Sequence, residues 1–183
     1  MKSNFMKIRK ALDSDLEDIL RVERAAFNSD EEAELVRQLI VDESAKPLLS
    51  LLAFKKDFAV GHILFTKVFL QNNEVDVSCM ILAPLAVIPE FQKSGIGSKL
   101  INTGLKILSE SGTDLVFVLG YPEYYTRYGF KSATCLGFEA PYSIPAEHEE
   151  AWMVISLRSE VIGLISGKVV CANALYKPEY WRE

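Results

Sequence analysis

The sequence predicts an α/β fold built on a mixed sheet, and three observations lead to that prediction. A nine-residue apolar run at 80–88 has the length and composition of a fully buried strand, and a glycine-bearing turn and an amphipathic helix follow it. A second apolar run at 114–120 comes after that helix, which predicts two parallel neighbouring strands. Upstream, apolar segments at 48–54 and 58–70 are joined by a short polar turn, as in an antiparallel hairpin.

The N-terminal part predicts one short strand and two amphipathic helices. Residues 6–10 alternate between polar and apolar side chains, which is typical of a strand. Asp13 or Ser14 is expected to cap the first helix, because acidic residues follow in the turn where the helix dipole favours them. The segment 28–30 is expected to end this helix and to cap the second, which stops before Pro47.

Two residues inside the predicted central strands indicate irregular pairing. Gly61 lies within the strand at 58–70 and predicts a bulge or a bend. Pro84 lies in the middle of the run at 80–88 and cannot donate a ladder hydrogen bond. Regular pairing on both sides is therefore disfavoured there, and a bulge or splay would leave backbone groups at 85–87 free for a ligand.

The remaining chain predicts one long helix followed by shorter elements. The long helix opens near Ser98 and ends at 111–112, and a short helix at 122–128 stops at a glycine. Further strands are expected at 152–157 and within 163–174, before an aromatic tail.

Composition limits the class of protein. A chain of 183 residues is expected to form one domain, with a core at about 6–158 and a C-terminal strand extension at 159–183. The net charge of −5 argues against nucleic acid as a partner, because phosphate neutralisation needs a basic face. No apolar stretch reaches the roughly 18 residues that span a bilayer, so no membrane partner is expected.

The cysteine and histidine content predicts neither disulfides nor a metal site. Three cysteines are odd in number, and Cys79 and Cys171 lie in apolar runs, as buried free thiols would. Only His62 and His148 are present, and no cysteine pair has ligand spacing, so no metal is expected. His62 lies in a strand and is expected to be structural. Free thiols and a leaderless N-terminus predict a cytoplasmic protein.

The turn after the run at 80–88 has the features of a phosphate or pyrophosphate site. The first N–H groups of a helix lack internal partners, and Gly95 and Gly97 allow a ligand to approach the backbone. No Lys-Ser/Thr pair follows a glycine as a Walker loop requires, and Leu100 replaces the third glycine of a dinucleotide fingerprint. What remains is Q-x-x-G-x-G, beginning at Gln92, after a strand that contains L-A-V.

Two motifs together resemble those of a known family. L-A-V-x-P-x-x-Q-x-x-G-I-G-x-x-L at 85–100 and V-L-G-x-P-x-Y-Y-x-R-x-G-F at 118–130 resemble the acetyl-CoA loop and the Y-x-x-x-G-F signature of the GNAT (Gcn5-related) N-acetyltransferase superfamily. The similarity is greatest to a bacterial subgroup, the YhbS-like proteins, and extends over about 6–174. It implies a mixed, mostly antiparallel central sheet that is splayed in the middle and carries helices on both faces.

The resemblance also implies a site and a reaction, in which an acetyl group passes from acetyl-CoA to a primary amine by direct attack. Backbone groups of Leu85, Ala86 and Val87 would pair with the pantetheine arm. Tyr125 would protonate the departing thiolate, since a phenol with a pKa near 10 keeps its proton at neutral pH. The residues that would bind the rest of the cofactor, chiefly its pyrophosphate, are Gln92, Lys93, Ser94, Gly95, Ile96, Gly97 and Ser98.

Some parts of the site stay open. Ser94 stands where the family often has a basic residue, and Tyr121 stands where the subgroup usually has an acidic one. The other tyrosines of the second motif compete with Tyr125 and are expected to be packed. An ordered water or one of four acidic residues would serve as the general base, namely Glu23, Glu31, Glu34 or Glu90. Cys79 is not expected to be a nucleophile.

The acceptor and the partners also stay open. A small-molecule or peptide amine fits, and the acidic segment at 13–43 is either the wall of a site for a cation or the solvated face of two helices. The C-terminal strand and the aromatic tail offer an edge for a homodimer. The alternative functions are a catalytically inactive CoA-binding regulatory or interaction module on the same fold, and a nucleotide-binding protein.

Overall fold

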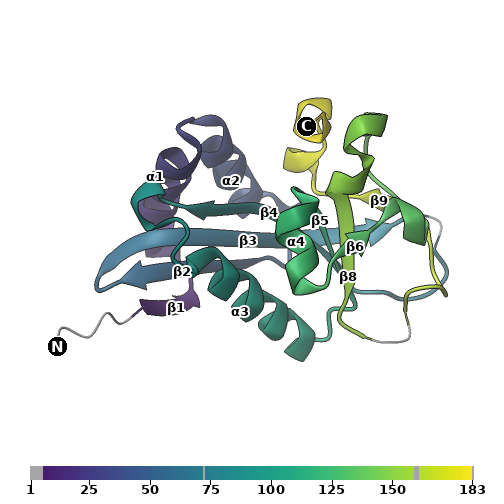
Figure 1. Cartoon of the computed structure of the whole chain (residues 1–183), viewed down its shortest axis with the longest axis horizontal. Coiled ribbons are helices and arrows are strands. Elements are labelled where there is room, and N and C mark those ends of the chain that lie inside the picture. Colours follow the sequence, from purple (N-terminus) through teal and green to yellow (C-terminus); the bar gives the residue numbers. More distant parts are fainter. Residues whose placement is uncertain (1–5, 72, 159–160, 183) are drawn as a thin grey trace.

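The computed structural model describes residues 6–71, 73–158 and 161–182, and the chain folds around a central sheet (Figure 1). The residues 159–160 and 183 of the expected C-terminal extension lie outside the described part. The sheet has the order β1-β2-β3-β4-β5-β8-β6, and β9 joins β3 and β7. The strands are β1 (Met6–Lys10), β2 (Leu49–Lys55), β3 (Phe58–Leu70), β4 (Cys79–Val87), β5 (Leu115–Leu119), β6 (Lys131–Ser132), β7 (Phe138–Glu139), β8 (Trp152–Ser156) and β9 (Gly167–Val170).

Most neighbouring strands run antiparallel, as the sequence predicted. The parallel pairs are β4 with β5, across the helical crossover, and β7 with β9. The α-helices are α1 (Leu16–Phe27), α2 (Glu31–Val41), α3 (Ile96–Glu110) and α4 (Pro122–Tyr125). Short 3₁₀ helices are η1 (Asp13–Asp15), η2 (Glu43–Ala45), η3 (Pro89–Phe91), η4 (Thr126–Tyr128), η5 (Thr134–Leu136), η6 (Ala146–Ala151), η7 (Asn173–Leu175) and η8 (Pro178–Trp181).

Helices cover both faces of the sheet, and alternate residues of β3 show why. A Cβ on Gly61 would lie 3.0 Å from side chains of α3, and Phe65 packs against Gly104 of the same helix. His62, which points to the opposite face, contacts Glu23 of α1. In Figure 1, α1 and α2 accordingly lie above the sheet and α3 lies below it.

The bulge predicted at Gly61 is confirmed. Ala53 pairs with Gly61, whereas the next residue, Phe54, pairs with Ala59. Val60 is therefore the extra residue of the longer strand.

The splay predicted at Pro84 is also confirmed. Ile63 pairs with Leu85 and Phe65 pairs with Leu82, so that Ala83 and Pro84 together face a single residue of β3. On its other side, β4 pairs with β5 only as far as Leu82. The two parallel strands part beyond that point, and the free half of β4 faces an opening.

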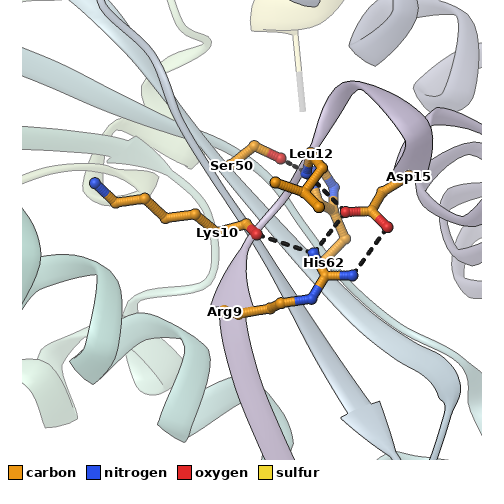
Figure 2. Close-up of polar contacts among 6 residues, drawn as sticks. All are labelled: Arg9, Lys10, Leu12, Asp15, Ser50 and His62. Carbon is orange, nitrogen blue, oxygen red and sulfur yellow. Dashed lines mark hydrogen bonds and ion pairs between the residues drawn. The ribbon is translucent and has the colours of Figure 1, made fainter.

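The predicted start of the first helix is wrong, whereas that of the long helix is correct to within two residues. Neither Asp13 nor Ser14 caps α1, because both lie in η1. Asp15 precedes α1, and its carboxylate accepts hydrogen bonds from Arg9 at 2.6 and 3.0 Å and from the N–H of Leu12 at 2.7 Å (Figure 2). The long helix α3 begins two residues before Ser98 and directly follows Gly95.

The C-terminal segment packs onto its own chain. The indole ring of Trp181 is buried, lies 5.6 Å from that of Trp152 and donates a hydrogen bond to the carbonyl of Leu175. Strand β9 has a partner on each side. The edges of β9 and the ring of Trp181 are thus covered within the chain, whereas Tyr176 of the aromatic tail is 46 % exposed. None of the described helices has the length and apolar character needed to cross a membrane.

Candidate active site

The opening between β4 and β5 is an elongated groove of about 1930 Å³. Its floor is the free half of β4, one wall is the turn before α3, and the facing wall is α4. The far end is closed by α1, α2, η6 and η8. Residues that represent these parts are Leu85, Gly97, Tyr125, Glu32, Glu147 and Trp181.

The turn before α3 is shaped to leave backbone N–H groups open. Lys93 and Gly95 both adopt left-handed conformations, with φ of 57° and 84°. The first helical hydrogen bond runs from the N–H of Lys99 to the carbonyl of Gly95, so the preceding amides of α3 have no partner inside the helix. Such a turn at a helix N-terminus favours an anion.

Two side chains fasten this turn to its surroundings. The amide of Gln92 donates to the carbonyl of Val87 at 2.9 Å, and the hydroxyl of Ser94 donates to the carbonyl of Phe91 at 2.5 Å. Gln92 therefore binds the turn to the end of β4.

Backbone groups of β4 alternate between β3 and the groove. The N–H of Ile88 donates to Val60 of β3 at 3.0 Å, and Ala86 pairs with His62. Because the two sides alternate along an antiparallel strand, Leu85 and Val87 direct their N–H and C=O groups away from β3. The carbonyl of Val87 on this side already accepts the hydrogen bond from Gln92. Nine of the cofactor-binding and catalytic residues expected from the sequence line the groove, and the two that do not are Ala86 and Ser94.

Tyr125 lines the groove from α4 and is held on several sides. Its ring contacts those of Tyr124 and Phe130 edge to face, at 5.1 and 5.6 Å. The side chain is only 8 % exposed, and burial raises the pKa of its phenol well above the usual value. The ring also lies against Gly120, where a Cβ would come within 2.4 Å of it.

The neighbouring tyrosines reach the N-terminus of α3. A Cβ on Gly97 would lie 2.6 Å from the hydroxyl of Tyr124, and the hydroxyl of Tyr128 lies 2.7 Å from that of Ser98. Burial, and then the bond to Tyr128, raise the pKa of Tyr124. Gly97 thus makes room for a tyrosine, a role that its sequence position did not reveal. Tyr121, at the rim of the groove, is 81 % exposed.

None of the four acidic residues proposed as bases lines the groove. Glu31, Glu34 and Glu90 are exposed, and Glu23 is completely buried. The groove is instead lined by Glu32, which sequence reasoning missed. The helical period of α2 could have revealed Glu32. It precedes Leu35, Val36 and Leu39 by three, four and seven residues and so lies on the same inward face of the helix.

Charged side chains line several parts of the groove. Lys93 lies on the turn, and Glu123 and Arg127 lie on α4 and η4. Glu32 lies on α2, and Glu147, His148 and Glu150 lie on η6.

The thiols lie apart from this chemistry. Cys79 and Cys171 are buried free thiols, as predicted, and burial raises the pKa of each to about 12. Among the described side chains, no three His, Cys, Asp or Glu residues gather as metal ligands would.

A sheet splayed between parallel strands, with an anion-binding turn on one side and tyrosines on the other, is the architecture of an α/β acyltransferase. The family model for the acetyltransferase (GNAT) domain matches residues 7–133. The chain therefore belongs to the GNAT acetyltransferase family, in which enzymes transfer acyl groups from acyl-CoA.

Relatives in the same family resemble nearly the whole chain. The N-acetyltransferase YjhQ of Escherichia coli K12 is 49 % identical over 87 % of this chain and 88 % of its own. The CoA complex of E. coli YhbS superposes with a TM-score of 0.87 at 28 % identity, covering 97 % of this chain and 95 % of that one. A GNAT acetyltransferase of Brucella melitensis, solved with acetyl-CoA, gives a TM-score of 0.74 at 28 % identity, over 94 % and 99 %.

Proposed function

We propose that this protein transfers the acetyl group of acetyl-CoA to a primary amine by direct attack, with Tyr125 as general acid. The observation that carries the proposal is the groove between the parting strands, which is lined both by the buried Tyr125 and by the half of β4 that does not pair with β5. The CoA and acetyl-CoA bound by YhbS and by the Brucella protein support acetyl-CoA as cosubstrate.

In this proposal the cofactor extends along the groove from the turn toward Glu32. The open amides of 93–98 hold the pyrophosphate, and Gln92 keeps the turn in place. The pantetheine amides pair with the backbone of Leu85 and Val87, whose polar groups point away from β3. Ala86, whose backbone faces β3, supports that segment by pairing with His62 and does not contact the cofactor.

Tyr125 then supplies the proton that the leaving group needs. Burial raises the pKa of its phenol, so the hydroxyl stays protonated at neutral pH. As the amine attacks the thioester carbonyl and the C–S bond breaks, the thiolate sulfur takes the proton from Tyr125. Solvent reprotonates the phenol at the open side of the groove.

The acceptor is a small-molecule or peptide amine, and the acidic side chains that α2 and η6 contribute to the groove favour one that is cationic when bound. We treat residues 1–183 as a single domain, because the C-terminal tail contributes Tyr180 and Trp181 to the groove. The free thiols suit a reducing cytoplasm.

Calorimetric titration with acetyl-CoA, CoA and ATP tests the cofactor site. The wild type is compared with a Gly95→Glu, Gly97→Glu double variant, which places negative charge and bulk where the pyrophosphate would bind. Gly112→Glu is the matched control for Gly95→Glu, because both glycines have a left-handed backbone and open space and lie at opposite ends of α3. Gly97→Glu also displaces the hydroxyl of Tyr124.

Micromolar acetyl-CoA binding that only the double variant loses supports the site. Binding without turnover of any amine would favour the inactive CoA-binding module, and binding of ATP alone would favour a nucleotide-binding protein.

A further inference from the structure

The far end of the groove carries a carboxylate that the proposed mechanism has not used. Glu32 lies in the first turn of α2 and lines the groove. It shares the inward face of that helix with the buried side chains of Leu35 and Val36. Its Oε2 atom is buried and has no hydrogen-bond partner among the described residues. A buried charge without a partner is costly, so this oxygen favours a positively charged or proton-donating ligand.

A second carboxylate nearby belongs to a buried polar array. Glu23 on α1 and His62 on β3 are fully buried, and Nδ1 of His62 lies 2.5 Å from Oε1 of Glu23. Nε2 of His62 lies 2.8 Å from the hydroxyl of Ser50 on β2 (Figure 2). With its proton on Nδ1, His62 donates to Glu23 and accepts from Ser50, and all three groups are then paired. The array fixes Glu23 between α1 and the sheet.

The two carboxylates influence each other. Burial raises the pKa of Glu23, the hydrogen bond and charge of His62 lower it, and the negative charge of Glu32 raises it. Oε2 of Glu23, like that of Glu32, is buried without a partner among the described residues. Two neighbouring carboxylates with unpaired oxygens favour one positive charge between or beside them, either a proton or an ammonium group.

We propose that Glu32, whose unpartnered oxygen is buried at the groove, accepts the proton of the acceptor ammonium. The inference rests on the proposed transfer to a primary amine and adds the group that activates the amine.

The protons balance along this route. The bound ammonium carries three N–H bonds and the amide product keeps one. The first proton passes to Glu32 and on to solvent, which frees the nitrogen lone pair for attack on the thioester carbonyl. The second passes from the nitrogen to solvent as the C–S bond breaks. The thiolate takes one proton from Tyr125, and solvent restores that proton to the phenol. Each acetyl transfer releases one proton overall.

Other titratable groups lie on the elements next to Glu32 and contribute to the electrostatic potential at its carboxylate. Two exposed acids share its helix, and Tyr180 of η8 faces them, with a pKa raised first by burial and then by acidic neighbours. The titratable groups on the adjoining elements are Glu23 on α1, His62 on β3, Glu31 and Glu34 on α2, Glu179 and Tyr180 on η8, and Glu147, His148 and Glu150 on η6.

The test compares Glu32→Gln with Glu31→Gln, which removes the neighbouring exposed charge of the same helical turn. Acetyl-CoA-dependent acetylation of putrescine, L-lysine and an unblocked peptide is followed from about pH 5.5 to about pH 9, a range in which a carboxylate base shows an acid limb. Acetyl-CoA affinity is measured on the same variants by calorimetry.

We expect Glu32→Gln to lower kcat/KM by ~10²–10⁴ at neutral pH, to abolish the acid limb and to keep acetyl-CoA affinity. Glu31→Gln should leave kcat/KM, the acid limb and acetyl-CoA affinity unchanged.

The outcomes separate the inference from the function. A wild type that acetylates an amine, with an unchanged rate and pH profile in Glu32→Gln, overturns the inference and leaves the proposed function. A wild type that binds acetyl-CoA but acetylates none of the amines overturns both. If Glu32→Gln does not fold, Glu32→Asp keeps the charge but shortens its reach, and an unchanged kcat in that variant would overturn the inference.

Discussion

The ring of Tyr125 lies so close to Gly120 that a Cβ at position 120 would come within 2.4 Å of it. The glycine therefore sets the position of the tyrosine, and it does so from the end of β5, directly beside the splay. A residue with no side chain of its own decides where the proposed general acid can lie.

Gly120→Ala should displace Tyr125 from the groove. We expect a loss of about 1–3 kcal/mol in the free energy of unfolding, as for other overpacked sites, and a fall in kcat with little change in acetyl-CoA affinity. Urea denaturation and steady-state kinetics check this. The double variant Gly120→Ala, Tyr125→Ala should lose less free energy of unfolding than the two single variants lose together, because the clash is gone once the ring is removed. If the two losses simply add, the contact does not constrain the ring.

Gly104→Ala tests the packing of α3 on the sheet. A Cβ at this position would lie 2.4 Å from the ring of Phe65. We expect a loss of about 1–3 kcal/mol in spite of the better helix propensity of alanine, measured by chemical denaturation. Asn102→Ala, at an exposed site on the same helix, is the control and should be neutral or slightly stabilising. A stabilising Gly104→Ala would contradict the close approach.

The ion pair of Arg9 and Asp15 should make stability depend on pH. The hydrogen bond from Arg9 holds the pKa of Asp15 below its ordinary value. Because the folded pKa is the lower one, the stabilisation is complete above about pH 4 and is lost as the pH falls through the folded value.

Asp15→Asn should thus cost about 1–2 kcal/mol at neutral pH, and its stability should approach that of the wild type in acid. Asp13→Asn, at an exposed position of η1, should cost little at any pH. Thermal unfolding from neutral pH to about pH 3 measures both differences. A constant gap between wild type and Asp15→Asn would contradict the assignment.

Local signals in the sequence predicted the sheet and its splay. Pro84 and Gly61 each carry a backbone restriction that acts wherever the residue lies, so the irregularities could be placed before any tertiary contact was known. The anion-binding turn was visible for the same reason, since glycine spacing before a helix is a local property.

What the sequence did not show depends on contacts between distant segments. The cap expected at Asp13 or Ser14 failed because both residues lie in η1, which Asp15 ties to Arg9 of the preceding strand. The room that Gly97 leaves for Tyr124 requires the packing of α4 on α3. Glu32 was overlooked because a glutamate on a helix normally faces solvent. Its place in the groove becomes visible only when the other elements that line the groove are known.

The most direct test of the central claim is the kcat of Tyr125→Phe, which removes one hydroxyl and keeps the ring over Gly120. Acetyl transfer to the amine panel is measured beside acetyl-CoA affinity, with Tyr121→Phe, at an exposed position on the rim, as the matched control. We predict that Tyr125→Phe lowers kcat by ~10²–10⁴ without weakening acetyl-CoA binding, and that Tyr121→Phe changes neither. An undiminished kcat in Tyr125→Phe would contradict the assignment of Tyr125 as the general acid.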